Sequence, residues 1–354
     1  MRIALISDTH LSARSPECVA NWHAASRAVE RLRPDATVHL GDITLDGQQH
    51  TDELGFAAAL VQHWPTRMHC LPGNHDMGDA SGELPLERGL LADYRRLFGA
   101  DRWHIAFDHW QLVGINAQLM GSDTAEEAEQ WQWLEDIARA SKPLTRTALF
   151  LHRPLSRVAN DPKKTGRYVA AAACGRLLNG PLASTLRLVV SGHTHQHLDQ
   201  TRAAVRHIWM PSSGFVLPDD MQARVGEKVV GIGVLELDEN DAAAEPRFDL
   251  WCPDGMTRHE LPQCLCGQAS RLAAIEVRIE HTHRGDGTHR QVVAARGLAD
   301  RLGRRAVVDA ERLAQVFTHI RVDPGDTTLQ VVLDHGAAGL GALRVDRNPQ
   351  AVGK

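Results

Sequence analysis

The sequence has no long hydrophobic run, and this argues against several classes of protein. No stretch comes near the roughly 18 uncharged apolar residues that are needed to cross a bilayer. The apolar run near the start, Ile3–Ile6, is four residues long and leads directly to Ser7 and Asp8, so it is too short for the core of a signal peptide. We therefore expect a cytoplasmic protein without a membrane partner.

Cysteine is also scarce, with 6 residues among 354 and no Cys-x-x-Cys spacing. This argues against a fold that is held together by a disulfide framework. Glycine and proline show no period, so the chain is neither collagen-like nor of low complexity. The net charge of −5 argues against a nucleic-acid partner, because a basic surface is what attracts a phosphate backbone.

The residues that are present are typical of a globular protein with a large core. Hydrophobic residues make up 43% of the chain and charged residues 23%, and the length favours two domains or one large domain with an appendage. Histidine is unusually frequent, with 20 residues. Because imidazole is a common metal ligand and titrates near neutral pH, these histidines indicate either a metal site or scattered surface and core positions.

The first 200 residues alternate short aliphatic runs with amphipathic helical patterns. Five of the runs have the length and composition of strands that are buried on both faces. They are Ile3–Ser7, Ala36–Leu40, Arg67–Leu71, Ala148–Leu151 and Leu186–Val190. Helices are predicted near 16–32, 51–63, 84–98, 124–140 and 168–179. This alternation predicts an α/β fold with a largely parallel sheet.

After residue 200 the pattern changes to strands without long helices. These strands are predicted at Val205–Met210, Val229–Leu237 and Arg247–Trp251, and an earlier hairpin is predicted from Trp103–Ala106 and Gln111–Ile115. Two packed sheets with helices on their outer faces fit both halves of the pattern.

A turn-rich stretch near 252–270 indicates a domain boundary. We assign a first, larger domain to residues 1–255 and a small α/β appendage to residues 256–354. The appendage is predicted to contain a strand around Ile275–Ile279, a hairpin loop around 281–289, helices near 288–303 and 309–318, and a closing strand at Leu329–Leu333.

Polar side chains follow each of the five predicted buried strands. They stand at the strand ends, which is the edge where α/β sheets hold their ligands. These candidate metal ligands are Asp8, His10, Asp42, Asn74, His152, His193 and His195. Oxygen and imidazole donors without a thiolate suit borderline divalent cations. Seven ligands are too many for one ion and sufficient for two if a carboxylate bridges them, which is the arrangement used in phosphate-ester hydrolysis.

With these residues in place, the sequence resembles the calcineurin-like metallophosphoesterase superfamily. Its five blocks, D-x-H, G-D, G-N-H-D/E, an H with a following H or P, and G-H-x-H, all occur in order within roughly residues 1–250. The resemblance implies a two-sheet β-sandwich flanked by helices and a centre of two metal ions of Mn, Fe or Zn type. It implies that Asp8, His10 and His195 hold one ion, that Asn74, His152 and His193 hold the other, and that Asp42 bridges them together with a water or hydroxide.

The resemblance also implies catalytic roles. Asp42 serves catalysis as the bridging ligand, and His75 faces the leaving-group oxygen as general acid or transition-state donor. Asp76 then supports this loop by hydrogen bonding.

Four residues are candidates for substrate binding: Asn74, His75, Arg153 and His197. Arg153 can form a bidentate contact with a phosphate, or it can simply extend to solvent. His197 lies two residues past the last ligand, where a histidine either lines the pocket or caps a turn.

In motif style the chain is most similar to the bacterial cyclic-nucleotide (class III) phosphodiesterases. The similarity rests on Gly41–Gly47 and Leu71–Asp76. The chain departs from other relatives at two positions. Leu45 stands where many of them, including the protein serine/threonine phosphatases, place an aspartate that pairs with the catalytic histidine, so a protein-phosphatase activity is disfavoured. The block that often contains H-H-P has Arg153 as its second residue.

The sequence thus predicts a metal-dependent phosphohydrolase. The favoured activity is a phosphodiesterase in which a metal-bound hydroxide attacks a nucleotide-like substrate such as a 3′,5′-cyclic nucleotide. A phosphomonoesterase and a nucleotide pyrophosphatase stay open, because substrate choice depends on loops outside the ligand shell. A non-catalytic scaffold is disfavoured, since no ligand is replaced. The appendage is expected to mediate self-association into a homo-oligomer or to cover part of the active site.

Overall fold

The computed structural model describes residues 1–80, 86, 88–155, 167–239, 241 and 243–261, together with four strands between residues 275 and 346. The chain divides into two compact units, Met1–Pro262 and Gln263–Lys354. Among the described residues, no helix combines the length and the apolar character that crossing a bilayer requires.

The first sheet of the larger unit has five strands in the order β11-β10-β1-β2-β3. Its strands are β1 (Arg2–Ile6), β2 (Ala36–His39), β3 (Met68–Cys70), β10 (Ile232–Glu236) and β11 (Arg247–Trp251). The pairs β1–β2 and β2–β3 are parallel, whereas β10 pairs antiparallel with β1 and with β11. The carboxyl ends of the three parallel strands therefore lie along one edge of the sheet.

The second sheet has six strands in the order β4-β5-β6-β7-β9-β8. Its strands are β4 (Trp103–Ala106), β5 (Trp110–Gly114), β6 (Arg146–Leu151), β7 (Leu186–Ser191), β8 (Leu198–Arg202) and β9 (Val205–Trp209). The central strands β5, β6, β7 and β9 are mutually parallel, and β4 and β8 pair antiparallel at the two margins.

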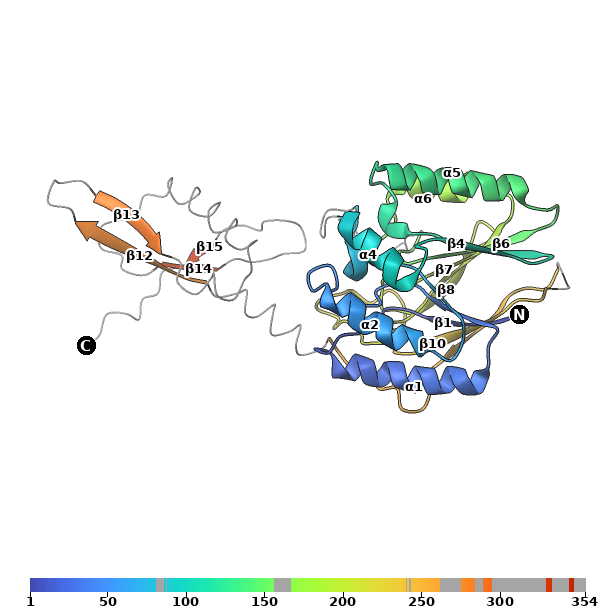
Figure 1. Cartoon of the computed structure of the whole chain (residues 1–354), viewed down its shortest axis with the longest axis horizontal. Coiled ribbons are helices and arrows are strands. Elements are labelled where there is room, and N and C mark those ends of the chain that lie inside the picture. Colours follow the sequence, from blue (N-terminus) through green and yellow to red (C-terminus); the bar gives the residue numbers. More distant parts are fainter. Residues whose placement is uncertain are drawn as a thin grey trace. The chain divides into compact units, whose positions relative to one another are not determined.

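Helices cover the outer faces of both sheets (Figure 1). The helices are α1 (Pro16–Leu32), α2 (Asp52–Gln62), α3 (Asn74–Met77), α4 (Arg88–Phe98), the 3-10 turn η1 (Ala117–Leu119), α5 (Ala125–Ala140) and α6 (Ala171–Asn179). Figure 1 shows α1 and α2 beside the sheet of β1 and β10, and α5 and α6 beside the sheet of β6 and β7. Helix α1 starts with Pro16 in its first turn and ends where Arg33 takes a left-handed conformation with φ 48°.

The core consists of layers that follow the two-residue period of the strands. Ile3 and Leu5 of β1 belong to the cluster that fills the space between the sheets, together with residues such as Phe150 and Val190. Ala4 and Ile6 point the other way, into the cluster under the helices α1 and α2. A third cluster lies between the second sheet and the helices α5 and α6. The unit is therefore a β-sandwich with a helical layer on each side, which confirms the predicted fold class.

The predicted elements of the first 261 residues are confirmed with boundary shifts of a few residues. The hairpin of Trp103–Ala106 with the following strand is also confirmed. Strand β8 (Leu198–Arg202) was not predicted. It has four exposed or half-buried polar residues and lies at the margin of its sheet, so its apolar pattern is too weak to detect.

The second unit contains an antiparallel sheet with the strand order β13-β12-β14-β15. Its strands are β12 (Ile275–His283), β13 (His289–Ala294), β14 (Leu329–Val332) and β15 (Arg344–Asp346). The predicted hairpin and closing strand are confirmed by the pairs β12–β13 and β12–β14. The predicted helix at 288–303 is wrong over 289–294, where Val292 and Val293 extend a strand by pairing with β12. The helix predicted at 309–318 lies outside the described residues.

Two buried histidines, one in each sheet, make stability depend on pH. Burial lowers the pKa of His39 to about 3 and the pKa of His207 to about 4, so both rings are neutral in the folded protein at pH 5. In the unfolded chain the same rings become protonated below about pH 6.5. The unfolded state then binds more protons, and the free energy of unfolding falls as pH drops, by about 2 kcal/mol per ring at pH 5.

Urea unfolding at pH 7.5 and pH 5 measures this effect. We expect wild type to lose more stability between the two conditions than His207→Gln, by about 2 kcal/mol. An identical pH dependence in both proteins would contradict the assignment of His207 as a neutral buried ring.

Candidate metal centre

The ends of five parallel strands bring the predicted ligands together. Asp8 follows β1, Asp42 follows β2, and Asn74 begins α3 just after β3. His152 follows β6 and His193 follows β7 in the facing sheet. Because the two sheets pack face to face, their carboxyl edges place these loops opposite one another.

One group of potential ligand atoms comes from Asp8, His10, Asp42 and His195, and these atoms lie within 4.8 Å of one another. The Nε2 atoms of His10 and His195 are 3.1 Å apart. His195 Nε2 is 3.5 Å from an oxygen of Asp8, and His10 Nε2 is 4.0 Å from Asp42 Oδ2. All four residues are buried, so the polar atoms face one another in the interior.

A second group consists of Asp42, His152 and His193, again with ligand atoms within 4.8 Å of one another. His152 Nε2 lies 3.3 Å from Asp42 Oδ2, 3.1 Å from His193 Nδ1 and 3.2 Å from Asn74 Oδ1. Asp42 is common to both groups. The arrangement has the oxygen and nitrogen donors that divalent cations such as Mn²⁺ and Zn²⁺ accept, so the cluster fits a metal centre.

The hydrogen bonds of two histidines also fit metal binding. His195 Nδ1 donates to the carbonyl of Phe215 at 2.8 Å, and His152 Nδ1 donates to the carbonyl of Leu40 at 2.9 Å. A neutral imidazole that donates from Nδ1 leaves a free lone pair on Nε2. Both Nε2 atoms point into the ligand groups, as in metal sites where a carbonyl fixes the orientation of a ligating histidine.

The backbone at the cluster is strained, which favours a functional over a structural interpretation. Five of the ten non-glycine residues with positive φ in the described chain are candidate ligands. They are Asp8 (51°), His10 (48°), Asp42 (51°), His193 (68°) and His195 (51°). Such conformations cost of order 1–3 kcal/mol each, persist only where the surrounding structure fixes them, and gather at functional sites.

The ionisable groups influence one another strongly in the absence of a cation. Burial alone would raise the pKa of Asp42, but the imidazoles of His152 and His75 outweigh burial and hold this pKa well below its usual range. Burial would lower the pKa of His152, but the Asp42 carboxylate raises it to about 8. Burial raises the pKa of Asp8. Burial lowers the pKa of His10 and of His193, and the charge of neighbouring imidazoles lowers both further.

His75 stands beside the cluster but in neither ligand group. Its backbone N–H donates to Asp42 Oδ1 at 2.9 Å, and its half-buried ring meets the His10 ring edge-to-face at 5.0 Å. The loop is fixed by Asp76, whose carboxylate accepts hydrogen bonds from the backbone N–H groups of Ile43, Thr44 and Gly73. Burial and the charge of Asp42 raise the pKa of Asp76 to about 6.

Gly73 is required by close approach of two loops. A β-carbon at this position would overlap the carboxylate and the backbone nitrogen of Asp42. We expect Gly73→Ala to displace Asp42 and to weaken Mn²⁺ binding by at least tenfold, the lower end of the range for residues that orient metal ligands. Calorimetric titration measures the affinity, and Gly55→Ala on α2, where a β-carbon meets nothing within 4 Å, is the control. Equal affinities of the two variants would contradict this role.

Arg153 is buried rather than extended to solvent. Its Nη2 donates to Asp79 Oδ2 at 2.6 Å, and its Nε atom has no hydrogen-bond partner among the residues that the structure describes. The charge of Arg153 opposes the rise in the pKa of His152 and contributes to the lowering of the pKa of His193, which places the guanidinium beside the second ligand group. Arg153 therefore brings a fixed positive charge to this group.

His197 lies apart from the other candidates. Its Nδ1 is 3.1 Å from the carbonyl of Trp209, and its ring stacks on Phe248 with centroids 5.5 Å apart. Its backbone exchanges two hydrogen bonds with Glu227. These contacts give His197 a structural environment between the second sheet and β11.

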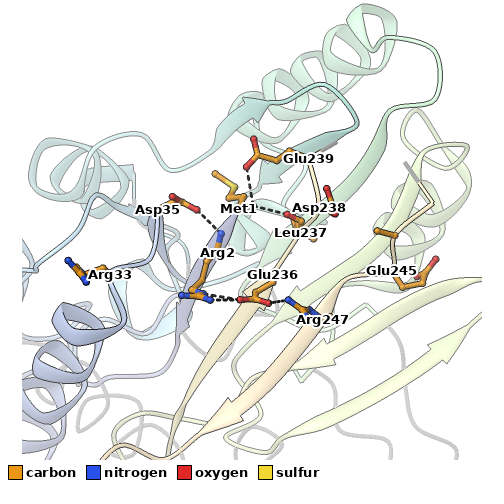
Figure 2. A pocket seen from close by; sticks show the side chains of 11 residues that line it. Met1, Arg2, Arg33, Asp35, Glu236, Leu237, Asp238, Glu239, Glu245 and Arg247 are labelled. Carbon is orange, nitrogen blue, oxygen red and sulfur yellow. Dashed lines mark hydrogen bonds and ion pairs between the residues drawn. The ribbon is translucent and has the colours of Figure 1, made fainter. Parts of the chain in front are cut away.

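A cavity of about 700 Å³ lies at the opposite edge of the first sheet, where β1 begins. Figure 2 shows Glu236 between Arg2 and Arg247, and Glu239 beside Met1. Arg2 and Arg247 both pair with Glu236, and the amino group of Met1 pairs with Glu239 at 3.0 Å. The cavity contains none of the predicted site residues.

Three residues near the cluster were missed in the sequence. Phe215 packs its ring 4.8 Å from the rings of both His10 and His195, Asp79 pairs with Arg153, and His39 lies beneath the loops of β1 and β2. None of them belongs to a motif block. Only His39 could have been noticed in the sequence, because it is a polar residue at the end of a buried strand.

Comparisons with known proteins agree with this geometry. The sequence profile of the family "Calcineurin-like phosphoesterase" matches residues 1–197. A "Probable cyclic nucleotide phosphodiesterase" of Psychrobacter arcticus is 28% identical over 222 residues, covering 57% of this chain and 75% of that protein. A protein of the same description from Synechococcus is 26% identical over 231 residues, covering 60% of this chain and 80% of its own length.

Among solved structures, GAP50 of Plasmodium, "the anchor in the inner membrane complex", superimposes with a TM-score of 0.52. It is 14% identical, and the match covers 74% of this chain and 88% of GAP50, so it supports the fold alone. The family match spans more than half of the chain and includes all seven predicted ligands. The chain belongs to the calcineurin-like phosphoesterase family.

Proposed function

We propose that this protein is a phosphodiesterase with two metal ions and that its substrate is nucleotide-like, such as a 3′,5′-cyclic nucleotide. The observation that carries the proposal is the pair of ligand groups that share Asp42. The two relatives described as cyclic nucleotide phosphodiesterases support the substrate class.

The proposed ligand set is divided between two ions. Asp8, His10 and His195 would hold one ion, Asn74, His152 and His193 would hold the other, and Asp42 would serve both. When bound, two such ions supply a water nucleophile at neutral pH and neutralise charge on the phosphoryl oxygens. The ions would be divalent or trivalent Mn, Fe or Zn.

The protein's own residues have three tasks in this proposal. Arg153, held by Asp79, adds a fixed cation for the phosphoryl group, and Asn74 gives its side chain to both metal and substrate. His75 carries a proton toward the leaving oxygen, since its ring is half-buried and its backbone is anchored on Asp42. His197 stays a candidate substrate contact, with its Nδ1 3.1 Å from the carbonyl of Trp209 and its ring stacked on Phe248.

The test uses the full chain, stripped of metal and reloaded with Mn²⁺. We expect it to hydrolyse bis(p-nitrophenyl) phosphate and 3′,5′-cyclic AMP, to lose both activities in EDTA, and to lose them in His193→Ala. Hydrolysis of p-nitrophenyl phosphate or of dinucleotide pyrophosphates, with both diesters left intact, would replace this proposal by a monoesterase or a pyrophosphatase. A folded, metal-loaded chain that attacks none of them would favour a non-catalytic scaffold.

We further propose that the protein acts in the cytoplasm and that its second unit mediates self-association or covers part of the active site. The support is a separate compact unit with its own four-stranded sheet beyond the phosphoesterase domain. Light scattering of the full chain measures its mass in solution.

A further inference from the structure

His39, the last residue of β2, lies directly beneath the candidate metal centre. Its side chain is fully buried, with 0% exposed. The ring belongs to neither group of potential metal ligands. It contacts instead the two loops that carry Asp8, His10 and Asp42, through Thr9 and Gly41.

Hydrogen bonding fixes which ring nitrogen carries the proton. The backbone N–H of Gly41 donates to His39 Nδ1 at 3.2 Å, so Nδ1 is an acceptor. The neutral ring then carries its proton on Nε2, which donates to Thr9 Oγ1 at 2.9 Å. The Thr9 hydroxyl in turn donates to the carbonyl of Ile43 at 3.2 Å. Every donor and acceptor in this chain of three hydrogen bonds is used.

The ends of this hydrogen-bond chain flank the proposed ligands. Thr9 lies between Asp8 and His10, while Gly41 and Ile43 lie on either side of Asp42. The two loops also exchange backbone hydrogen bonds, from the Asp8 N–H to Gly41 and from the His10 N–H to Asp42. The backbone of the ligands in these loops, Asp8, His10 and Asp42, nevertheless takes the left-handed conformation. This conformation persists only where neighbouring contacts fix it.

We propose that His39 and the Thr9 hydroxyl are positioning residues that hold Asp8, His10 and Asp42 in the conformation that binds metal. The inference rests on the proposed function, because it assumes that these three residues are ligands. His39 acts through Thr9 and Gly41 and touches neither metal nor substrate. Partners of this kind outside the ligand shell typically contribute 10–100-fold to metal affinity.

A role in stability alone is the alternative, and Thr37 provides the matched control. Thr37 lies two residues before His39 on the same strand and is equally buried. Its hydroxyl also makes two hydrogen bonds, with Trp64 Nε1 at 2.9 Å and with Thr66 Oγ1 at 2.7 Å. Neither Trp64 nor Thr66 is adjacent in the sequence to a proposed ligand. Thr37→Val therefore removes a buried hydroxyl without loosening the loops that carry Asp8, His10 and Asp42.

The experiment measures Mn²⁺ affinity by calorimetric titration of the metal-stripped full chain, together with the melting temperature without metal. We expect Thr9→Val and His39→Leu to weaken Mn²⁺ binding by roughly 10-fold or more. Thr9→Ser restores the hydroxyl and is expected to bind close to wild type. Thr37→Val is expected to lower the melting temperature and to leave Mn²⁺ affinity unchanged.

Two outcomes would overturn the inference. Thr9→Val that binds Mn²⁺ as tightly as Thr37→Val, or Thr9→Ser that loses as much affinity as Thr9→Val, would show that the hydroxyl does not position the ligands. If His39→Leu does not fold, the three threonine variants decide the question. The proposed function fails separately, when wild type itself binds no Mn²⁺.

Discussion

Asp42→Asn is expected to lose Mn²⁺ from the centre and to reduce phosphodiesterase kcat/KM by roughly 10³-fold or more, a larger effect than the 10–100-fold typical of residues outside the ligand shell. The substitution keeps the shape of the side chain and an oxygen that can accept the N–H of His75, so it removes mainly the charge. Asp42 is the one residue common to both ligand groups, and its Oδ2 lies 3.3 Å from His152 Nε2 and 4.0 Å from His10 Nε2.

The control for this variant is Asp199→Asn. Asp199 is an exposed carboxylate on β8 that pairs with Arg206 at 2.6 Å, and it contacts none of the proposed ligands. The two variants are compared by metal content after dialysis and by hydrolysis of bis(p-nitrophenyl) phosphate. Asp42→Asn that retains two ions per chain and wild-type rates would refute the assignment of Asp42 as the shared ligand.

His75→Ala is expected to lower kcat by about 10²–10⁴-fold, the range for a general acid, while metal content stays as in wild type. The separation arises because the His75 side chain lies in neither ligand group, although its ring is 5.0 Å from that of His10. The loss should depend on the leaving group. A 4-nitrophenolate leaves without a proton, whereas the ribose oxygen of a cyclic nucleotide requires one, so cyclic AMP hydrolysis should suffer more.

The matched control is His63→Ala, at the carboxyl end of α2. His63 is exposed, and its Nδ1 is 2.8 Å from the carbonyl of Ala59 within the same helix. We expect this variant to behave as wild type with both substrates. Equal losses of His75→Ala toward the nitrophenyl ester and the cyclic nucleotide would indicate that His75 does not protonate the leaving oxygen.

Much of the fold could be predicted because its signals are local. The aliphatic runs at β1 and β2 are short and continuous, and a strand buried on both faces requires such a pattern. Asp8 and Asp42 could be placed at one edge of the first sheet, and His152 and His193 at one edge of the second, because parallel strands end at the same side. No knowledge of the packed structure was needed for these inferences.

Other features depend on contacts between residues that are distant in the sequence. Arg153 could equally have faced solvent, and the partner that buries it, Asp79, lies 74 residues earlier. His39 acquires its position from Thr9, 30 residues earlier. His197 follows the G-H-x-H block closely, and its ring stacks on Phe248 of the distant strand β11. Spacing in a sequence does not determine such pairings.

The helix predicted from residue 288 illustrates a further limit. Residues 289–294 are three polar residues followed by two valines and an alanine, a stretch too short for periodicity to separate a helix from a strand. Pairing with β12 makes it a strand. β-Structure depends on a partner strand more than on intrinsic propensity.

Metal stoichiometry tests the central claim most directly. The full chain, stripped of metal and titrated with Mn²⁺, is expected to bind two ions, as measured by calorimetry and by elemental analysis after dialysis. His193→Ala should then retain fewer than two, because it removes a ligand from one group and leaves Asp8, His10 and His195 intact. Wild-type protein that is folded and holds far less than two ions per chain would contradict the account.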